Sequence, residues 1–333
     1  MNNKNITFHW IRHAESCANV GQNDIQNSIK NLDLTNIIDK IIDTYTYHPN
    51  LSYKGMMQAI NLNKFINEQT YDVIICSAMV RTCMTALLSL MNKPNTVIYV
   101  VPFINEVPSG LPIDVTNTAL DTYSLKKNII AIRKWLYDNN KISDSVLNNP
   151  KFDFSIMNNI MKNKPDLDLT KESLENFFTS VMPEIRNLRN LIKKQDIKIC
   201  AFSHGHFINK IVNHITKNND YMKLDNTEVI EIDNNNKITT IYKPIYIENK
   251  SEINVCDGLK KFLYEINKNN QQELNNEHNN DINNNIQKMF IYSDGDIKEL
   301  NDKMQIGGNN YKYKYMKYKM KYIKHTKSNQ YMQ

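Results

Sequence analysis

The feature that most constrains the fold is a regular alternation of apolar, strand-like runs with helical patterns. Runs rich in β-branched and apolar residues are typical of buried strands, and four of them occur, at 6–11, 72–76, 96–101 and 197–202. Between them, Lys54–Glu68 carries apolar residues at helical spacing, and Met79–Met91 is apolar almost all round. Strands that alternate with helices pair into a mainly parallel sheet covered on both faces. We therefore predict an α/β fold, a three-layer α/β/α sandwich.

A long insertion interrupts this alternation before the fourth strand. Between Glu106 and Ile197 the pattern is mostly helical, with its clearest helices at Leu125–Tyr137 and Lys171–Ile192. Thr170 is the candidate N-cap of the second helix, because its hydroxyl can accept a backbone hydrogen bond. The sequence thus predicts a helical cap insertion over about residues 107–195.

The remaining chain divides by composition. After the fourth strand, Glu228–Ile232 and Lys237–Tyr242 are joined by an Asn-rich turn, which predicts a closing β-hairpin. We assign 1–250 to one domain. Residues 251–306 form an Asn-rich linker, which we expect to be largely disordered because so polar a segment cannot bury enough apolar surface. A basic Tyr/Lys tail follows at 307–333.

The positive charge belongs to the tail. Tyr311–Gln333 contains seven Lys and no acids, whereas the whole chain has a net charge of +6, so the rest is near neutral. This balance argues against a nucleic-acid-binding fold. The favoured interpretation of the tail is a solubilising or partner-docking segment with no catalytic role. The alternative is contact with an acidic partner, nucleic acid or a membrane surface, which Tyr interleaved with Lys would suit.

Cysteine usage and the N-terminus bear on location. The five Cys lack metal-ligand spacing, and Cys76 and Cys200 lie in apolar runs, where reduced Cys behaves as a small hydrophobe. We expect a reducing compartment. The N-terminus has no apolar signal-peptide region, and no apolar run reaches the ~18 residues of a membrane span. These features predict a cytoplasmic protein without a transmembrane segment.

Polar motifs occur where the predicted strands end, the edge at which α/β proteins hold their sites. The motifs, in chain order, are Arg12-His13-Ala14-Glu15-Ser16, Leu51-Ser52-Tyr53-Lys54-Gly55, Ser77-Ala78-Met79-Val80-Arg81-Thr82, Glu106 and Ser203-His204-Gly205-His206. Each stands at a strand or helix boundary, so we expect them to meet in one site.

The residue types in this series suit phosphoryl transfer, which needs a nucleophile and positive charge around the phosphoryl oxygens. His13 is the candidate nucleophile, because an imidazole is basic enough to attack phosphorus and the phosphoimidazole is labile enough to be hydrolysed. Arg12 and Arg81 would clamp the oxygens with guanidinium groups that match phosphate geometry. A protonated His204 adds a third donor, and Glu106 would give a proton to the leaving oxygen.

Together these motifs resemble the histidine phosphatase superfamily, also called phosphoglycerate mutase-like. The resemblance implies that His13 accepts the phosphoryl group and that Arg12, Arg81 and His204 complete its pocket, with Glu106 as proton donor. It also adds Asn19, which matches the Asn that ends the family's Arg-His-Gly-Glu-Ser-x-x-Asn pattern. The resemblance covers about residues 5–245 and implies no cofactor and no metal.

Three positions refine the resemblance. Ala14 replaces the usual Gly, a mild change, and Gly205 after His204 is typical of the mutase-like branch. After Glu106 comes Val107-Pro108-Ser109-Gly110, where phosphoglycerate mutases continue with Arg-His-Tyr-Gly. This last departure favours a phosphatase over a mutase. The tail also resembles Gly-Gly/Tyr/Lys tails of some large-DNA-virus proteins, which would allow a host cytoplasm or virion location.

Simpler interpretations stay open for several residues. His204 and His206 share a strand face if the strand continues, as a metal-binding pair would, but no third ligand lies nearby in sequence. We expect His206 to be a capping residue or one that supports the site residues from behind, and His9 to pack or to face solvent. Arg133-Lys134-Trp135 is either a solvated helix face, the favoured interpretation, or a substrate-facing part of the cap.

Three functions follow, in order of preference. The first is a metal-independent phosphomonoesterase that hydrolyses a phosphorylated small molecule or phosphoprotein through a phosphohistidine. The second is a phosphoglycerate mutase-like enzyme that moves a phosphoryl group within a metabolite. The third is a catalytically idle phosphate-binding module whose tail recruits nucleic acid or a partner. Specificity would come from the cap, whose side-chain directions a single sequence does not reveal.

Overall fold

The computed structural model describes most of the predicted domain. The described residues are 5–21, 49–93, 95–107, 122–143, 149–188, 191, 193–218, 222–244, 256 and 290–291. All of them belong to the first, Met1–Ile291, of the two units into which the chain divides. The basic tail at 307–333 lies outside the described residues. Among the described residues no helix is long and apolar enough to cross a membrane.

The core of the fold is an eight-stranded sheet with the order β7-β6-β1-β5-β2-β3-β4-β8. The pairs from β1 to β8 in this order are parallel, and β6 and β7 are antiparallel additions at the β1 edge. The strands are β1 (Asn5–Arg12), β2 (Val73–Ser77), β3 (Val97–Val101), β4 (Lys151–Asp153), β5 (Asp196–Ser203), β6 (Val229–Ile232), β7 (Ile238–Tyr242) and β8 (Phe290–Ile291). The four predicted strands and the predicted hairpin are confirmed.

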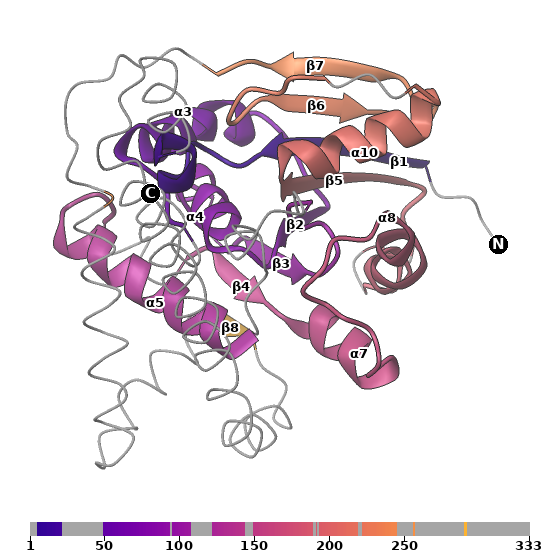
Figure 1. Ribbon diagram of the computed structural model, residues 1–333, viewed down its shortest axis with the longest axis horizontal. Coiled ribbons are helices and arrows are strands. Elements are labelled where there is room, and N and C mark those ends of the chain that lie inside the picture. Colours follow the sequence, from indigo (N-terminus) through magenta and orange to yellow (C-terminus); the bar gives the residue numbers. More distant parts are fainter. Residues whose placement is uncertain are drawn as a thin grey trace, which may run out of the picture. The chain divides into compact units, whose positions relative to one another are not determined.

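Helices cover both faces of the sheet, as Figure 1 shows. The helices are α3 (Tyr53–Asn67), α4 (Val80–Ser89), α5 (Thr122–Asp138), α7 (Ser155–Asn163), α8 (Leu174–Asn176), the π-helix η2 (Phe177–Val181), α9 (Met182–Arg186) and α10 (Gly205–Thr216). α3, α4 and α5 lie on one side and α7, α8 and α10 on the other. The predicted three-layer α/β/α architecture is therefore confirmed.

Successive side chains of a strand point to opposite faces of the sheet, and both faces are covered by helices, so strand residues of both orientations are apolar. On β1, Trp10 is buried with Phe177 of η2 and Phe207 of α10 in one large hydrophobic cluster. Its neighbour Ile11 is fully buried too, although successive side chains of a strand point to opposite faces. The α4 helix on the second face is buried along its whole length, as its uniformly apolar pattern predicts.

The insertion before β5 differs from the prediction in two places. Lys151–Asp153 forms β4 and pairs in parallel with β3, so the insertion also extends the sheet. A three-residue strand is too short to show a period of two in the sequence. The predicted helix Lys171–Ile192 is divided into α8, η2 and α9, and Pro183 at the start of α9 explains the break. A proline removes one helical hydrogen bond and crowds the preceding turn.

The N-cap of that segment is also corrected. Ser173, rather than Thr170, caps α8, because its side chain accepts from the backbone N–H of Asn176. The Thr170 hydroxyl instead donates to Asp168. Both residues are good N-caps by type, so only the backbone path distinguishes them.

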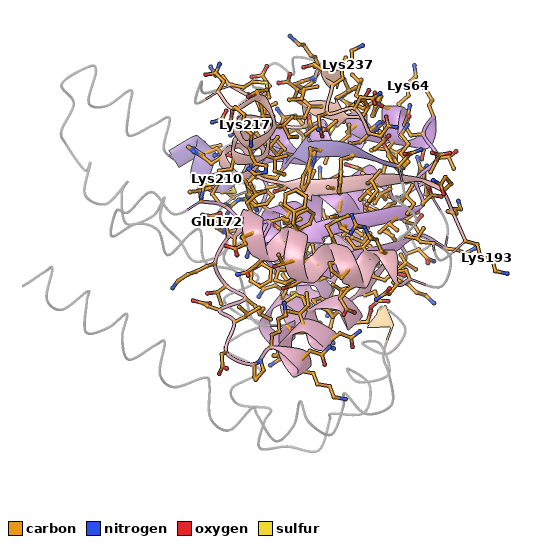
Figure 2. The ribbon with its side chains drawn as sticks, turned by 90° about the vertical axis from the view of Figure 1, so that its right-hand side faces the viewer. Lys64, Glu172, Lys193, Lys210, Lys217 and Lys237 are labelled. Atoms are coloured by element: carbon orange, nitrogen blue, oxygen red, sulfur yellow. A yellow bond between two sulfur atoms is a disulfide. The ribbon has the colours of Figure 1, made fainter. Side chains whose placement is uncertain are left out.

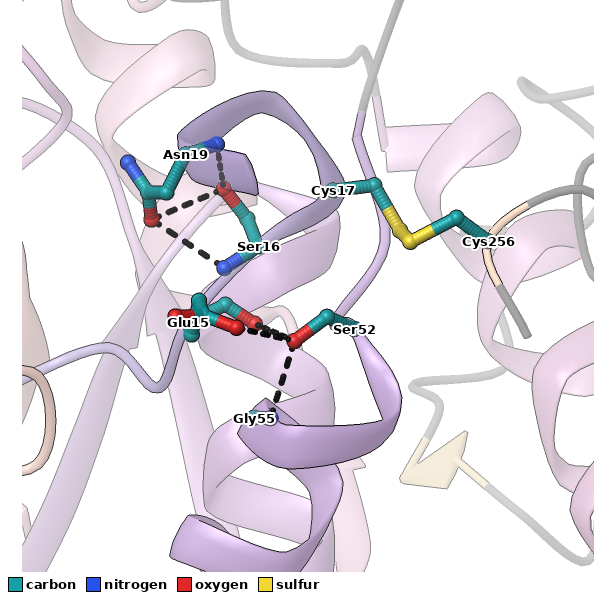
Figure 3. The surroundings of a disulfide bond; sticks show 7 residues. All are labelled: Glu15, Ser16, Cys17, Asn19, Ser52, Gly55 and Cys256. Atoms are coloured by element: carbon teal, nitrogen blue, oxygen red, sulfur yellow. Dashed lines mark hydrogen bonds between the residues drawn. A yellow bond between two sulfur atoms is a disulfide. The ribbon is translucent and has the colours of Figure 1, made fainter. Parts of the chain in front are cut away.

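Cysteine chemistry is the largest departure from expectation. Cys17 and Cys256 form a disulfide across a sequence separation of 239 residues, which Figure 3 shows beside the Ser16 turn. Disulfides are rare in reducing compartments, so this bond counts against the expected reducing environment. Cys76 and Cys200 are buried free thiols, as predicted, and so is Cys83.

The predicted linker contributes two described parts to the first unit. Cys256 carries the disulfide, and β8 pairs with β4. The rest of 251–306 lies outside the described residues, so its predicted disorder remains a prediction.

Candidate active site

The Arg-His motif stands at the carboxyl end of β1 and is held by backbone contacts on both sides. The His13 N–H donates to the Ser203 carbonyl of the adjacent β5 (2.9 Å), and the Ala14 N–H donates to the Thr85 hydroxyl of α4 (3.0 Å). Arg12 is the last residue of β1, and its Nη1 donates to the Leu224 carbonyl. The motif is therefore fixed between the sheet and its flanking elements.

A loop ahead of β6 completes this support. The Asn226 side chain donates to the His13 carbonyl (2.9 Å), and the Thr227 N–H donates to the Arg12 carbonyl (3.0 Å). Thr227 has a φ of 65°, a conformation that is a strained outlier for a β-branched residue. Neither residue stood out in the sequence, where Asn is common and this loop bears no motif.

His13 itself is buried, with 2 % of its surface exposed. Its Nδ1 lies 2.7 Å from the Ala14 carbonyl oxygen. A carbonyl can only accept, so the Nδ1 must carry the hydrogen and the Nε2 keeps its lone pair. Arg81 Nε donates to this Nε2 over 3.2 Å. His13 thus has the tautomer that a nitrogen nucleophile needs.

Arg81 reaches His13 from the first turn of α4 and is 4 % exposed. Burial lowers the pKa of Arg81 to about 10, an effect that Glu106 opposes and Arg12 reinforces. The guanidinium therefore stays charged at neutral pH. It is a fixed buried cation next to the imidazole.

His204 follows β5 and occupies the N-cap position of α10. Its ring centroid lies 5.0 Å from that of His13. Ser77 Oγ lies 2.8 Å from the Nε2, and Glu106 Oε2 lies 3.7 Å from the Nδ1. The two histidines and the glutamate therefore converge from the ends of three different strands.

Glu106 is positioned by the segment that leaves β3. Phe103 has a φ of 70°, and the Ser203 hydroxyl donates to the Ile104 carbonyl (2.7 Å). The Glu106 Oε1 accepts from the Val107 N–H (3.1 Å). Its side chain is 14 % exposed, so this carboxylate combines contact with the buried His204 and access to solvent.

Gly205 allows Arg12 to pack closely. A Cβ at this position would lie 3.3 Å from Arg12 Nε, tighter than most real contacts. A second glycine, Gly55, passes against the Glu15 backbone, where a Cβ would lie 1.9 Å from the carbonyl oxygen. The Glu15 side chain accepts from Ser52 (2.8 Å), which also caps α3 (Figure 3). The predicted Leu51–Gly55 motif thus supports the Arg-His loop.

The electrostatics of the site favour an anion. Burial lowers the pKa of His13 well below its usual value, and Arg81 and Arg12 lower it further. The pKa of His204 is lowered in the same way, first by burial and then by Arg81, His13, Arg12 and His206. Two guanidinium groups and two neutral imidazoles therefore face one carboxyl side chain, that of Glu106. In contrast, the lysines labelled in Figure 2, such as Lys64, Lys193 and Lys237, project from the periphery of the molecule.

The site also contains polar atoms that lack partners. Within the described part of the chain, Arg12 Nε and His204 Nδ1 are buried and have no hydrogen-bond partner. Buried polar groups are nearly always paired, and a bound acceptor is one explanation for such an exception.

A metal ion suits this site less well than an anion. One ligand atom each of His13, Glu106 and His204 lies within 4.8 Å of the others. However, Arg81 donates to His13 Nε2, and both Arg12 and Arg81 already lower the pKa of the imidazoles by their charge. A divalent cation would meet the same repulsion. In the described part of the chain, His206, the second member of the alternative His204–His206 metal pair, is not part of the His13–Glu106–His204 group.

The other predicted residues take different positions. Asn19 Oδ1 accepts from both the N–H and the hydroxyl of Ser16, so this end of the amide holds the turn rather than a ligand (Figure 3). His206 is exposed. Arg133 is fully buried on α5, with its Nη2 donating to the Pro150 carbonyl, so the favoured solvated-face interpretation is wrong for it. Lys134 is exposed, and Trp135 is buried.

Comparisons with known proteins give one sequence relative. No protein-family model matches the chain. An uncharacterized protein of Acanthamoeba polyphaga mimivirus, R658, is 33 % identical over 201 residues, which are 51 % of this chain and 37 % of the relative. The chain therefore spans little more than a third of the length of the relative it matches.

Solved structures give several further likenesses. The alpha-ribazole phosphatase of Shigella flexneri is 18 % identical, with 73 % of this chain and 100 % of that chain covered and a TM-score of 0.38. A phosphoserine phosphatase of Entamoeba histolytica is 13 % identical (72 % and 98 % covered, TM-score 0.35). A phosphoglycerate mutase of Bacillus anthracis is 12 % identical (78 % and 98 % covered, TM-score 0.33). By name, these three solved structures are two phosphatases and a phosphoglycerate mutase.

Proposed function

We propose that this chain is a metal-independent phosphomonoesterase that acts through a phosphohistidine at His13. The observation that carries the proposal is the pair of buried, unpartnered polar atoms, Arg12 Nε and His204 Nδ1, on two residues whose motifs meet at His13. Leaving one such group unpaired costs about 1–3 kcal/mol. A tetrahedral phosphoryl group would supply an acceptor oxygen for Arg12 Nε, and for His204 Nδ1 once that nitrogen is protonated.

The first step is attack on phosphorus. His13 Nε2 forms the N–P bond with its lone pair while the P–O bond to the leaving group breaks. Arg12 and Arg81 bind the phosphoryl oxygens as charge spreads over them, and Arg81 transfers its present hydrogen bond from His13 to an oxygen. Glu106 delivers its proton to the leaving oxygen, which departs as an alcohol.

The second step is hydrolysis. Water attacks the phosphohistidine, the N–P bond breaks, and the electron pair returns to His13 Nε2. The Glu106 carboxylate takes a proton from this water and is restored to the acid form for the next turnover. The partial exposure of Glu106 supports this role, because the hydrolytic water must reach its carboxyl group. A phosphorylated small molecule and a phosphoprotein both remain candidate substrates.

The test is phosphate release from para-nitrophenyl phosphate in the presence of EDTA. The full chain is compared with His13→Ala and with His9→Ala, a matched change of a second buried histidine, which lies within β1. We expect activity that survives EDTA, disappears in His13→Ala and persists in His9→Ala. Activity retained by His13→Ala, or abolished by EDTA, would contradict the proposal.

A phosphoenzyme measurement separates hydrolysis from transfer. A stoichiometric phosphohistidine that forms from a phosphorylated metabolite, and that passes to a second metabolite rather than to water, would identify a mutase instead. Absence of both turnover and phosphohistidine would leave a phosphate-binding module. Inorganic phosphate binding, measured by calorimetry, would then be the remaining function of the site.

A further inference from the structure

Behind His204 lies a chain of two buried hydroxyl groups that the reaction above does not use. Ser77 is the last residue of β2, and Thr82 lies in the first turn of α4, and both are fully buried. Ser77 Oγ lies 2.8 Å from His204 Nε2 and 2.7 Å from Thr82 Oγ1. Thr82 Oγ1 lies 2.6 Å from the Met79 carbonyl oxygen and 3.0 Å from that of Ser77. We call Ser77 and Thr82 the hydroxyl relay.

The number of hydrogens in the relay indicates its direction. Carbonyl oxygens can only accept, so the short contact with Met79 requires the single hydroxyl hydrogen of Thr82. The contact between the two hydroxyls must then use the hydrogen of Ser77. Ser77 has no hydrogen left to give to the imidazole, so His204 Nε2 must be the donor in the last contact.

We propose that Ser77 and Thr82 are positioning residues that hold His204 in the Nε2–H tautomer, so that any further proton must add at Nδ1. The Nδ1 is the buried, unpartnered nitrogen that lies 3.7 Å from Glu106 Oε2. His13 is held in the opposite tautomer by the Ala14 carbonyl. The two rings therefore present different nitrogens to the same space.

This arrangement links binding of an anion to uptake of a proton. The charged or titratable groups around His204 are Arg81, His13, Arg12, His206 and Glu106. In the free site burial and the two guanidinium groups favour the neutral ring, whose Nδ1 has a lone pair. A dianion bound by those guanidinium groups would reverse this balance, and one proton from solvent would form an N–H bond at Nδ1. Only this consequence rests on the proposed function; the tautomer itself does not.

The decisive measurement needs no turnover. Long-range ¹H–¹⁵N correlation spectra of the full chain report the protonation of each imidazole nitrogen, and His204→Gln assigns the resonances. For the free protein at pH 7.5 we expect a protonated Nε2 and an unprotonated Nδ1 at His204. Sodium tungstate, a tetrahedral dianion that carries no proton at this pH, should protonate the Nδ1 as well.

A His204 that has its hydrogen on Nδ1 in the free protein would overturn the proposal. So would a tungstate complex in which the Nδ1 stays bare. An Nε2–H tautomer in a protein that hydrolyses no phosphate ester would support the relay and count only against the phosphatase. The two ideas therefore fail separately.

Thr82→Ala and Thr82→Ser provide matched variants, because they differ by a single oxygen atom. Thr82→Ala frees the Ser77 hydrogen to point at His204, so we expect a mixture of tautomers and tungstate binding that is about tenfold to a hundredfold weaker. Thr82→Ser keeps the hydroxyl and should retain both the wild-type tautomer and tungstate binding. Unchanged tautomer and affinity in a folded Thr82→Ala would contradict the proposal. If this variant does not fold, the wild-type spectra still decide.

Discussion

Two buried histidines, one within β1 and one just after it, have imidazoles with very different surroundings. His9, in the middle of β1, has partners at both ring nitrogens: Tyr71 at Nδ1 (2.9 Å) and Glu231 at Nε2 (2.9 Å). His13, just past the end of β1, has a carbonyl at one nitrogen and a guanidinium at the other. Both rings are nearly inaccessible, at 1 % and 2 % exposed.

The difference lies in the charge that surrounds each ring. Burial lowers the pKa of His9, but its hydrogen bond to Glu231 works in the opposite direction. His13 has no such carboxylate partner, and Arg81 and Arg12 add to the effect of burial. A completed pair such as His9–Glu231 stabilises structure. An imidazole beside two cations is open to an incoming anion, and burial alone does not distinguish the two cases.

The largest expected effect tests this contrast directly. His13→Ala should lower aryl phosphatase activity by roughly 10⁴-fold, because a nucleophile cannot be replaced by its neighbours. His9→Ala should change the rate by less than about threefold but lower the free energy of unfolding by about 1–3 kcal/mol through its lost hydrogen bonds. Initial rates and urea denaturation measure the two quantities. If His13→Ala and His9→Ala lowered the rate equally, the contrast between a catalytic and a structural histidine would be wrong.

Glu106→Gln should have the next largest effect. A glutamine cannot give or take a proton, so we expect a rate roughly 10³-fold lower for an alkyl phosphate. The loss should be smaller for para-nitrophenyl phosphate, whose leaving group departs without a proton. Comparing kcat for the two substrates checks this, and equal losses would show that Glu106 acts in some other way.

Arg81→Lys should cost about 10²-fold in kcat/KM. The lysine keeps the charge but loses the planar guanidinium that donates to His13 and would bind phosphoryl oxygens. Exposed Arg186, changed to Lys in the same way, is the control. A rate unaffected by Arg81→Lys would mean that charge alone suffices at this position.

The smallest effect concerns stability and pH. His13 has a lowered pKa in the folded protein, so below about pH 6.5 the unfolded chain binds a proton that the folded chain does not. Stability should therefore fall as the pH falls from this value, with His13 contributing up to about 1.4 kcal/mol per pH unit. Urea denaturation of wild type and His13→Ala at pH 7.5 and 5.5 measures it. The free energy of unfolding of His13→Ala should depend less on pH than that of the wild type. An equal pH dependence in the two proteins would contradict a lowered pKa of His13.

The sequence was sufficient to predict those elements whose pattern lies within a few neighbouring residues. Apolar runs predicted β1, β2, β3 and β5, and the polar residue that follows each run reaches the same sheet edge, because parallel strands end there together. The convergence of His13, Glu106 and His204 could be expected on this ground. Their catalytic roles are still predictions.

The sequence was insufficient where one element depends on a distant one. β4 forms by pairing with the edge of β3, and its own three residues have no pattern that predicts a strand. Asn226 contacts His13 across 213 positions, and Cys17 bonds Cys256 across 239. No residue type or spacing near these positions indicates the partner.

For this protein, then, the sequence by itself determined the layered α/β architecture and which residue types stand at the strand ends. Periodicity and residue chemistry act over a few neighbouring positions, so both can be read from the chain. Only the tertiary structure decided how those side chains are used. Which nitrogen of His13 and of His204 holds the hydrogen depends on a carbonyl and on two hydroxyls that folding brings within about 3 Å.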